Sequence, residues 1–299
     1  MSATAKDYFE LHFTVLIWGF TAVLGLLITL PAVEVVLYRT LIAAIGLGLL
    51  ILLRRGSFGI GNREITKIAG TGLLIGLHWI CFFESARMST ASVSLAGMAT
   101  TSLWTSLLEP VMIKGKKLQW FEPVLGLIAI VGIVIIFNVE VRYIWGLVVG
   151  ILAALLSAVF TIINSRLTIK HDHFVITYYE MLSAFVAIFF FLLLSGSMSD
   201  MALPQSMDWL WLLILGLVCT VYAYSISVKI MRRLTPFTVN LTVNLEPIYG
   251  ILLAVAIFGE KEEMNPGFYW GTGLILLSVL LYPIIKRYER RRTALRTSA

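Results

Sequence analysis

One apolar stretch of the sequence, residues 237–258, carries a group of side chains that could bind a small charged solute. Glu246 is about 15 Å into this stretch at 1.5 Å per helical residue, and it follows Asn240, Thr242 and Asn244. A charge at the centre of a bilayer costs about 2.5–3.5 kcal/mol, so Glu246 needs a partner or a function. It could hold a substrate amine or exchange a proton; the alternative is a neutral glutamate that fastens two helices.

Other apolar stretches contain further ionisable and aromatic candidates. His78, with Trp79 beside it, could bind a solute or relay protons near neutral pH, or could hydrogen-bond to a neighbouring helix. Arg39 is only about 9 Å from the end of its stretch, so it could hold a substrate carboxylate, snorkel, or pair with Glu34. Trp18 lies deep enough in its own stretch to line a cavity.

Hydroxyl side chains are concentrated in the middle of the stretch 91–113. They could bond back to their own helix or line a cavity, and they comprise Thr100, Thr101, Ser102, Thr105 and Ser106. Near the end of the same stretch, Glu109 lies within a turn or two of Lys116, which predicts an ion pair at the membrane edge. Glu180 lies near an edge of its stretch and, from its depth, is not a partner for Arg39.

The composition indicates a membrane protein. Of the 299 residues, 59% are hydrophobic and 13% are charged, and the mean hydropathy is +0.91, whereas soluble domains have about 25% charged residues. Cys81 and Cys219 lie in separate apolar stretches without metal-ligand spacing, and no phosphate-binding GxxxxGK[ST] motif occurs. We therefore expect no metal, no cofactor and no nucleotide hydrolysis by this chain.

Ten apolar stretches are long enough to cross a hydrocarbon core of about 30 Å. We expect an all-α polytopic membrane protein with ten transmembrane helices, which span residues 11–30, 33–53, 65–83, 91–113, 120–138, 143–165, 174–194, 209–228, 237–258 and 267–286.

The basic residues support this segmentation. Nineteen of the 23 Lys and Arg residues fall in the termini and loops of one side, three fall on the other side, and Arg39 lies inside a span. Cytoplasmic loops are enriched in Lys and Arg, so we expect both termini in the cytoplasm and the chain in the cell (inner) membrane. The basic tail, residues 287–299, then indicates contact with anionic lipid and not with nucleic acid.

The two halves of the sequence match weakly when they are shifted by 144 residues. This shift pairs His78 with Tyr222 and Ser102 with Glu246, each at a similar place in its span. Because each half has five spans, an odd number, the second half must cross the membrane in the opposite sense. We therefore expect two inverted five-helix repeats, residues 11–138 and 143–286, with a substrate site between them.

Several segments resemble a known transporter family. The five-plus-five layout is accompanied by WGF from Trp18, YRTLIAA from Tyr38, HWICFFESARMSTASVSLA from His78, CTVYAY from Cys219 and LEPIYGILLAVAIFGEKEEMNPGFYWGTGLIL from Leu245. In this order they resemble EamA-type members of the drug/metabolite transporter superfamily. The resemblance implies two EamA repeats, a central cavity lined by the first, third and fourth helices of each half, and export or exchange of amino acids and other small metabolites.

We expect a secondary transporter of small neutral or zwitterionic solutes, with a proton as a candidate coupling ion. Since Arg39 is the one Lys or Arg well inside a span, solutes with several negative charges are disfavoured. An intramembrane enzyme that acts on a lipid or hydrophobic substrate is the alternative, although neither HExxH nor GxSxG occurs. A structural or signalling role is a third possibility.

GxxxG pairs such as Gly72 and Gly76 could seat close helix contacts, in a monomer or a homodimer.

Reporter fusions can test the predicted topology. Because the Lys and Arg residues are so unequally divided, a reporter at Ser298 and one in the loop 195–208 are expected on opposite sides of the membrane. An activity pattern that places both reporters on the same side would contradict the ten-span arrangement.

Overall fold

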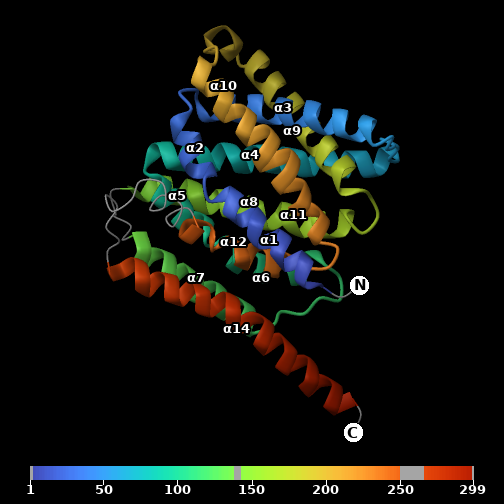
Figure 1. Cartoon of the computed structure of the whole chain (residues 1–299), viewed down its shortest axis with the longest axis vertical. Helices are drawn as coiled ribbons and strands as arrows, with labels where there is room; N and C mark the ends of the chain where they lie inside the picture. The colour runs from blue at the N-terminus through green and yellow to red at the C-terminus, as the bar shows by residue number, and fades with distance from the viewer. Residues whose placement is uncertain (1–2, 138–142, 250–265, 298–299) are drawn as a thin grey trace.

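The computed structural model describes residues 3–137, 143–249 and 266–297, and every regular element in those ranges is a helix (Figure 1). The helices are α1 (Ala5–Trp18), α2 (Thr21–Leu27), α3 (Ala32–Leu53), α4 (Asn62–Met88), α5 (Ala91–Met98), α6 (Thr101–Met112), α7 (Phe121–Phe137), α8 (Ile144–Leu167), α9 (His173–Leu194), the short 3₁₀-helix η2 (Ser197–Asp200), α10 (Ser206–Leu213), the π-helix η3 (Ile214–Tyr224), α11 (Ser225–Ile230), α12 (Pro236–Val243) and α14 (Pro266–Thr297).

Six helical segments of the described residues are long and apolar enough to cross a membrane. They are Ala32–Leu53, Asn62–Met88, Ile144–Leu167, His173–Leu194, Ser206–Ile230 and Tyr269–Glu289. All six overlap stretches that the sequence predicts as spans. The chain is therefore a multi-pass helical membrane protein. The end of the predicted span 237–258 lies outside the described residues.

Several predicted spans are interrupted, which the apolar pattern did not indicate. α1 and α2 are separated by a turn at Gly19 and Phe20, and α5 and α6 by a turn at Ala99 and Thr100. Hydroxyl groups accompany both turns: Thr21 donates to the Trp18 carbonyl at 2.8 Å, and Thr100 donates to the Gly97 carbonyl at 2.8 Å. Because lipid hydrocarbon offers no hydrogen-bond partner, such local bonds satisfy carbonyls near the break.

A third interruption ends α12 at Val243, just before Glu246. The chain turns at Asn244 and Leu245, and helical structure resumes at Glu246. Pro247 accounts for the break, because it has no N–H group to donate to the carbonyl of Val243 four residues earlier. The carboxyl group of Glu246 consequently lies at the start of a new helical turn.

The helices of the two halves pack in reciprocal pairs. α4 packs along α8, while α1 packs against α11 and η3. Similarly, α4 contacts α9 and α3 contacts η3, and α6 contacts α12. α7 and α14 run side by side along one edge of the molecule (Figure 1). This arrangement leaves α1, α4, α8, η3 and α12 around a common centre.

Glycine allows the closest of these helix contacts. A methyl group on Gly72 of α4 would overlap the Ser183 side chain and the Glu180 backbone of α9. Gly150 of α8 faces Gly97 of α5 at similarly short range. Gly72, from the predicted GxxxG pair Gly72 and Gly76, therefore seats a contact between helices of the same chain.

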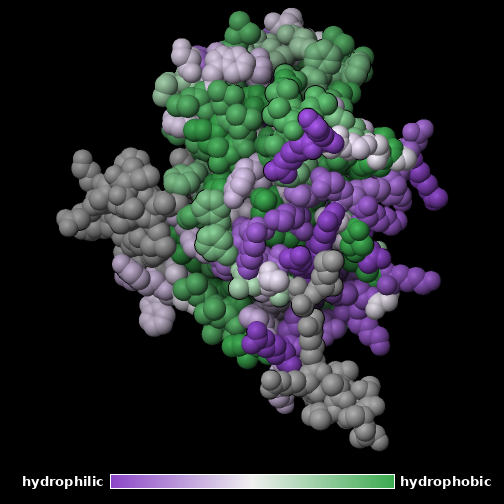
Figure 2. All heavy atoms as spheres, turned by 45° about the vertical axis from the view of Figure 1, so that its right-hand side comes forward, coloured by the Kyte–Doolittle hydropathy of each residue, from purple (hydrophilic) through white to green (hydrophobic). Residues whose placement is uncertain are grey.

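The polar surface is concentrated at one end of the helices. Figure 2 shows hydrophilic side chains gathered on one side of the molecule and a broad apolar surface beside them. The described basic residues of the loops after α3, α6, α8 and α11 lie in segments that join helices at this end. Such an unequal division of the surface is what a chain crossing a bilayer requires.

The contact at Gly72 can be tested by substitution. Gly72→Ala should lower stability by about 1–3 kcal/mol, because the added methyl has no space against α9. Gly70→Ala is the matched control: its methyl would meet nothing within 4 Å, and alanine is the better helix former. Thermal unfolding in detergent should show a lower midpoint for Gly72→Ala alone; equal midpoints for both variants would contradict this packing.

Candidate functional site

A central cavity of about 70 Å³ lies where the helices of the two halves meet. Residues from α1, α3, α4, α5, α8, η3, α11 and α12 line it together with Thr21 and Glu246. Its lining comprises Trp18, Thr21, Arg39, His78, Trp79, Phe82, Met98, Ser157, Phe160, Thr161, Tyr224, Ser227, Met231, Val239, Asn240, Val243 and Glu246. The cavity therefore combines aromatic walls with a few polar groups, which is typical of a small-molecule site.

Glu246 is the acidic group of the described cavity lining. Its side chain is buried, with 6% of the residue exposed, and its Oε1 lies 3.4 Å from the Thr21 hydroxyl, whose single hydrogen is shared with the Trp18 carbonyl. The interruption after α12 places this carboxyl at the beginning of a helical turn. The sequence predicted the depth of Glu246, and the structure shows that its side chain faces the cavity.

Arg39 supplies a positive charge to the same cavity. Its Nε donates to the Thr220 hydroxyl at 2.9 Å, and its guanidinium carbon lies 3.7 Å from the centre of the Trp79 ring. With 3% of the residue exposed, Arg39 does not snorkel to the edge, and it turns to Thr220 and Trp79 instead of pairing with Glu34. The stacking and the hydrogen bond hold this cation in place within the protein.

The aromatic walls are fixed by contacts between the two halves. Trp18 Nε1 donates to the Cys219 carbonyl at 3.1 Å. The rings of Trp79 and Tyr224 meet edge to face at 5.9 Å between centroids, and Tyr224 meets Phe160 in the same way at 6.3 Å. Because each ring is held by its neighbours, the cavity has a defined shape.

His78 joins α4 to α8 while its ring also lines the cavity. Its Nδ1 bonds to the Ala153 carbonyl at 2.8 Å, and its ring packs edge to face against Phe160 at 5.3 Å. A carbonyl can only accept, so Nδ1 carries the hydrogen and Nε2 remains for another contact. His78 thus makes the predicted hydrogen bond to a neighbouring helix and also lines the cavity.

The hydroxyl-rich segment of α6 forms a helix contact and does not line the cavity. Thr101 donates to the Met98 carbonyl at 2.6 Å, and Thr242 of α12 donates to the Thr238 carbonyl at 2.9 Å. Between the two helices, Asn244 Nδ2 donates to Ser102 Oγ at 3.2 Å. Of the two predicted asparagines, Asn240 lines the cavity, while its Nδ2 donates to Thr105 Oγ1 at 2.7 Å. The sequence predicted that α6 and α12 form a polar pair. In the structure, the polar side chains of these two helices bond mainly to each other and to their own helices.

Tyr222 is predicted at the site but lies elsewhere, whereas Tyr224 was not predicted and lies in the cavity wall. Tyr222 is 46% exposed and packs edge to face against Phe13. Both tyrosines lie in η3, whose π-helical register places side chains on different faces from those of an α-helix. On α8, the spacing of Ser157 and Thr161 at i and i+4 could have indicated a second polar face.

Two acidic residues outside the cavity also find partners. Lys116 Nζ lies 2.9 Å from Glu109 Oε1, which confirms the predicted ion pair. Glu180 on α9 is fully buried and accepts a hydrogen bond from the Tyr224 hydroxyl at 3.2 Å. Within the ranges that the structure describes, no three His, Cys, Asp or Glu side chains come together as a metal site would need.

Comparisons with known proteins show which family model the chain matches and which solved structure shares its fold. The model of the EamA-like transporter family matches residues 11–138 and 144–282. An uncharacterized transporter of Archaeoglobus fulgidus is 23% identical over 292 residues, which cover 93% of this chain and 96% of that protein. A protein of known crystal structure superimposes with a TM-score of 0.76 at 15% identity, over 95% of this chain and 100% of the other. At that identity, the last likeness shows a shared fold alone.

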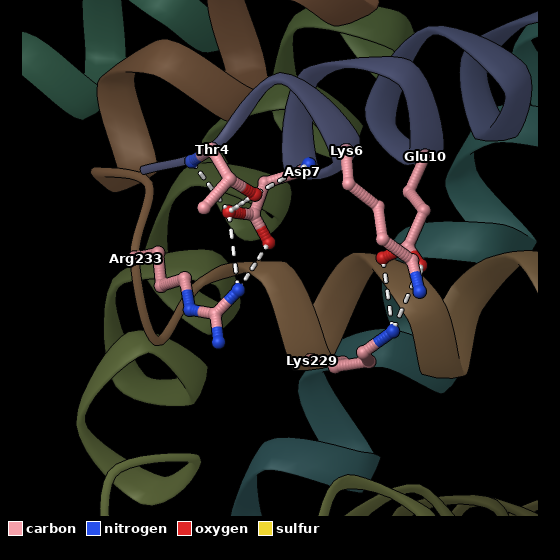
Figure 3. A network of polar contacts seen from close by, with 6 residues as sticks. All are labelled: Thr4, Lys6, Asp7, Glu10, Lys229 and Arg233. Carbon is pink, nitrogen blue, oxygen red and sulfur yellow. Dashed lines mark hydrogen bonds and ion pairs between the residues drawn. The ribbon is translucent and has the colours of Figure 1, made fainter. Parts of the chain in front are cut away.

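Ion pairs join the start of α1 to the end of α11 and the loop that follows (Figure 3). Arg233 Nη1 lies 3.1 Å from Asp7 Oδ1, and Lys229 Nζ lies 2.9 Å from Glu10 Oε1. Asp7 also caps its own helix, since it accepts hydrogen bonds from the N–H and the hydroxyl of Thr4. Through these contacts, charged groups hold the first and eighth predicted spans together at the polar end of the molecule.

The contribution of Asp7 should depend on pH. Burial alone would raise the pKa of Asp7, but hydrogen bonds from Thr4 and the Arg233 guanidinium outweigh it, so its pKa lies below the usual value. A group of this kind stabilises the fold above the unfolded-state pKa of about 4, and the effect is lost as pH falls through the lower folded-state pKa.

Asp7→Asn should therefore lower stability near pH 7 by about 1 kcal/mol, because water reaches the Arg233 side of the ion pair and weakens it. The difference from the unmodified protein should begin to shrink near pH 4 and disappear as pH falls below the folded-state pKa of Asp7. Asp200→Asn, a substitution of an exposed aspartate, is the control. Thermal unfolding midpoints that differ equally at both pH values would contradict the assigned interaction.

Proposed function

Because the chain belongs to the EamA-like transporter family, we propose that it is a secondary transporter of small neutral or zwitterionic metabolites, such as amino acids. It exports or exchanges them by alternating access around the central cavity. The observation that carries the proposal is the presence of two opposite charges, Arg39 and Glu246, in one cavity with aromatic walls.

The charges suit a solute that carries both an amine and a carboxylate. Glu246 is suited to contact the cationic group and Arg39 the carboxylate, while Trp18, Trp79 and Tyr224 cover the remaining apolar surface. A dianion would lose its hydration and meet a single guanidinium, which already stacks on Trp79. Sugar phosphates and nucleotide sugars are therefore poor substrates in this proposal.

Two inverted repeats, residues 11–138 and 143–286, would provide the alternating movement. The reciprocal packing of α4 on α8 and of α1 on α11 supports such symmetry. So do the interruptions at 99–100 and 244–245, which fall at nearly equivalent positions after a shift of 144 residues. We propose ten transmembrane helices in the inner membrane, with both termini and the basic tail, residues 287–299, in the cytoplasm.

The ion pairs of Figure 3 suit a closed cytoplasmic end in this mechanism. Asp7 and Glu10 belong to the first half, whereas Lys229 and Arg233 belong to the second. In an alternating-access cycle these pairs separate when the cavity opens toward the cytoplasm. Partly exposed pairs suit this role, because water replaces their partners at little cost in free energy.

The contacts of the cavity do not favour an intramembrane enzyme. Such an enzyme needs a nucleophile beside a base, or paired carboxylates. His78 is bonded through Nδ1 to a backbone carbonyl, and Glu246 to Thr21, so these two ionisable groups do not form a catalytic pair in the described lining. A small solute and the surrounding lipid are the partners that the proposal requires of the chain, as a monomer or a homodimer.

Glu246→Gln tests the proposed solute contact. Gln preserves the size of the side chain and the hydrogen bond from Thr21 but removes the charge, so folding should be normal. Loss of a charge-assisted hydrogen bond of about 1.5–3 kcal/mol should weaken binding about 10- to 150-fold. A thermal-shift screen of amino acids and related metabolites first identifies a ligand, and uptake into proteoliposomes then measures its transport.

Glu84→Gln, which removes an exposed carboxyl group from α4, is the matched control for Glu246→Gln. If both variants bind and carry the solute at the rate of the unmodified protein and with its pH profile, Glu246 only fastens helices. Saturable uptake of a sugar phosphate would contradict the proposed substrate class.

A further inference from the structure

A second buried carboxyl group lies outside the cavity and has no role in the proposed solute contacts. Glu180 on α9 is 0% exposed and its carboxyl accepts the Tyr224 hydroxyl hydrogen at 3.2 Å. Asn164 of α8 approaches the same tyrosine, with its Nδ2 donating to the hydroxyl oxygen at 2.9 Å. Residues from α8, α9 and η3 therefore form one hydrogen-bonded group.

This group has more acceptors than donors. Glu180 Oε1 and Asn164 Oδ1 are both buried, and neither has a hydrogen-bond partner. Leaving a buried acceptor unpaired costs about 1–3 kcal/mol, and an isolated buried charge costs more. One hydrogen bound to Glu180 neutralises the carboxylate and gives this group the additional donor that it lacks.

Tyr224 connects this group to the central cavity. Tyr224 lines the cavity, where its ring contacts Trp79 and Phe160, and its hydroxyl donates to Glu180 Oε2. The Trp79 ring also carries the guanidinium of Arg39 at 3.7 Å. A solute that displaces these rings must therefore change the hydrogen bond between Tyr224 and Glu180.

We propose that Glu180 is the binding site of the coupling proton, which reaches it from the cavity through the hydroxyl of Tyr224. In this step the hydroxyl passes its hydrogen to Glu180 Oε2 and takes one from a hydronium ion that enters the cavity, which leaves a water molecule and Tyr224 unchanged. The net result is that the carboxylate gains one proton and its charge changes from −1 to 0. This inference rests on the proposed transport function and divides the work between two carboxyl groups: Glu246 for the solute and Glu180 for the proton.

The surroundings of Glu180 suit a proton site and not an ion pair. Tyr224 of η3 is the titratable group in contact with the carboxyl. Arg39 of α3 and His78 of α4 line the cavity beyond it, and α11 presents Lys229, whose ammonium is held by Glu10. Among the described residues no Lys, Arg or His forms an ion pair with Glu180, so protonation is the available way to neutralise it.

Glu180→Gln separates proton coupling from solute binding. Gln retains one acceptor for Tyr224 and provides an amide donor for Asn164, as the protonated acid would, so the variant should fold and exchange solute at equilibrium. With one proton per solute, a gradient of one pH unit drives about tenfold accumulation in proteoliposomes, and Glu180→Gln should abolish that accumulation while counterflow continues. Glu84→Gln, an exposed carboxyl on α4, should leave both assays unchanged.

Infrared spectroscopy tests the proton site without any solute. The purified protein should show a protonated-carboxyl band that is lost in Glu180→Gln and retained in Glu84→Gln. Tyr224→Phe leaves the acid in place but removes the hydroxyl, so the band should shift and its exchange in D₂O should slow.

The outcomes distinguish this inference from the proposed function. If the unmodified protein carries no solute but the infrared band disappears in Glu180→Gln, the proton site stands and the transport proposal fails. If Glu180→Gln retains proton-driven accumulation, or its infrared spectrum equals that of the unmodified protein, Glu180 is not the proton site. Should Glu180→Gln fail to fold, an unchanged band and exchange rate in Tyr224→Phe would overturn the route through the tyrosine.

Discussion

Polar groups at membrane depth must be satisfied within the protein, and most features of this structure follow from that constraint. In hydrocarbon there is no water to bond an open carbonyl or to solvate a charge. The interrupted helices therefore carry Thr21 and Thr100 beside their breaks, where each hydroxyl bonds a nearby carbonyl. The buried charge of Arg39 is likewise satisfied within the protein, by a hydrogen bond to Thr220 and by stacking on Trp79.

The same constraint explains why α6 and α12 fasten to each other. Asn240 and Asn244 each provide amide hydrogens, and Thr105 and Ser102 provide the acceptors on the facing helix. These bonds connect the two halves immediately beside the cavity, and Asn240 belongs to both the contact and the cavity wall. Polar residues that look like one binding site in the sequence can thus have two roles: some hold two helices together, and others line the cavity.

Depth was the part of the site that could be predicted from the sequence. Counting residues from the ends of each apolar stretch identified Glu246 as a deep charge and put Arg39 nearer an edge, and both line one cavity with Trp18, His78 and Trp79. Depth alone does not show which side of a helix faces the centre, which is why Thr101 and Thr242 were predicted at the site but bond to their own helices. The position of Glu180 was also predicted, yet its contact with Tyr224 depends on packing between distant segments.

The π-helix η3 has a consequence for reading related sequences on a helical wheel. A wheel drawn at 100° per residue assumes 3.6 residues per turn, but the i to i+5 bonds of a π-helix make each turn wider. Over the eleven residues of η3 the difference in angle accumulates, so such a wheel does not give the relative directions of side chains at its two ends. A single-residue insertion or deletion within this segment would rotate the remainder of the helix relative to the cavity, whereas a conservative substitution would not. Sequence gaps near residue 220 therefore carry more information about the shape of this cavity than the identity of the residues beside them.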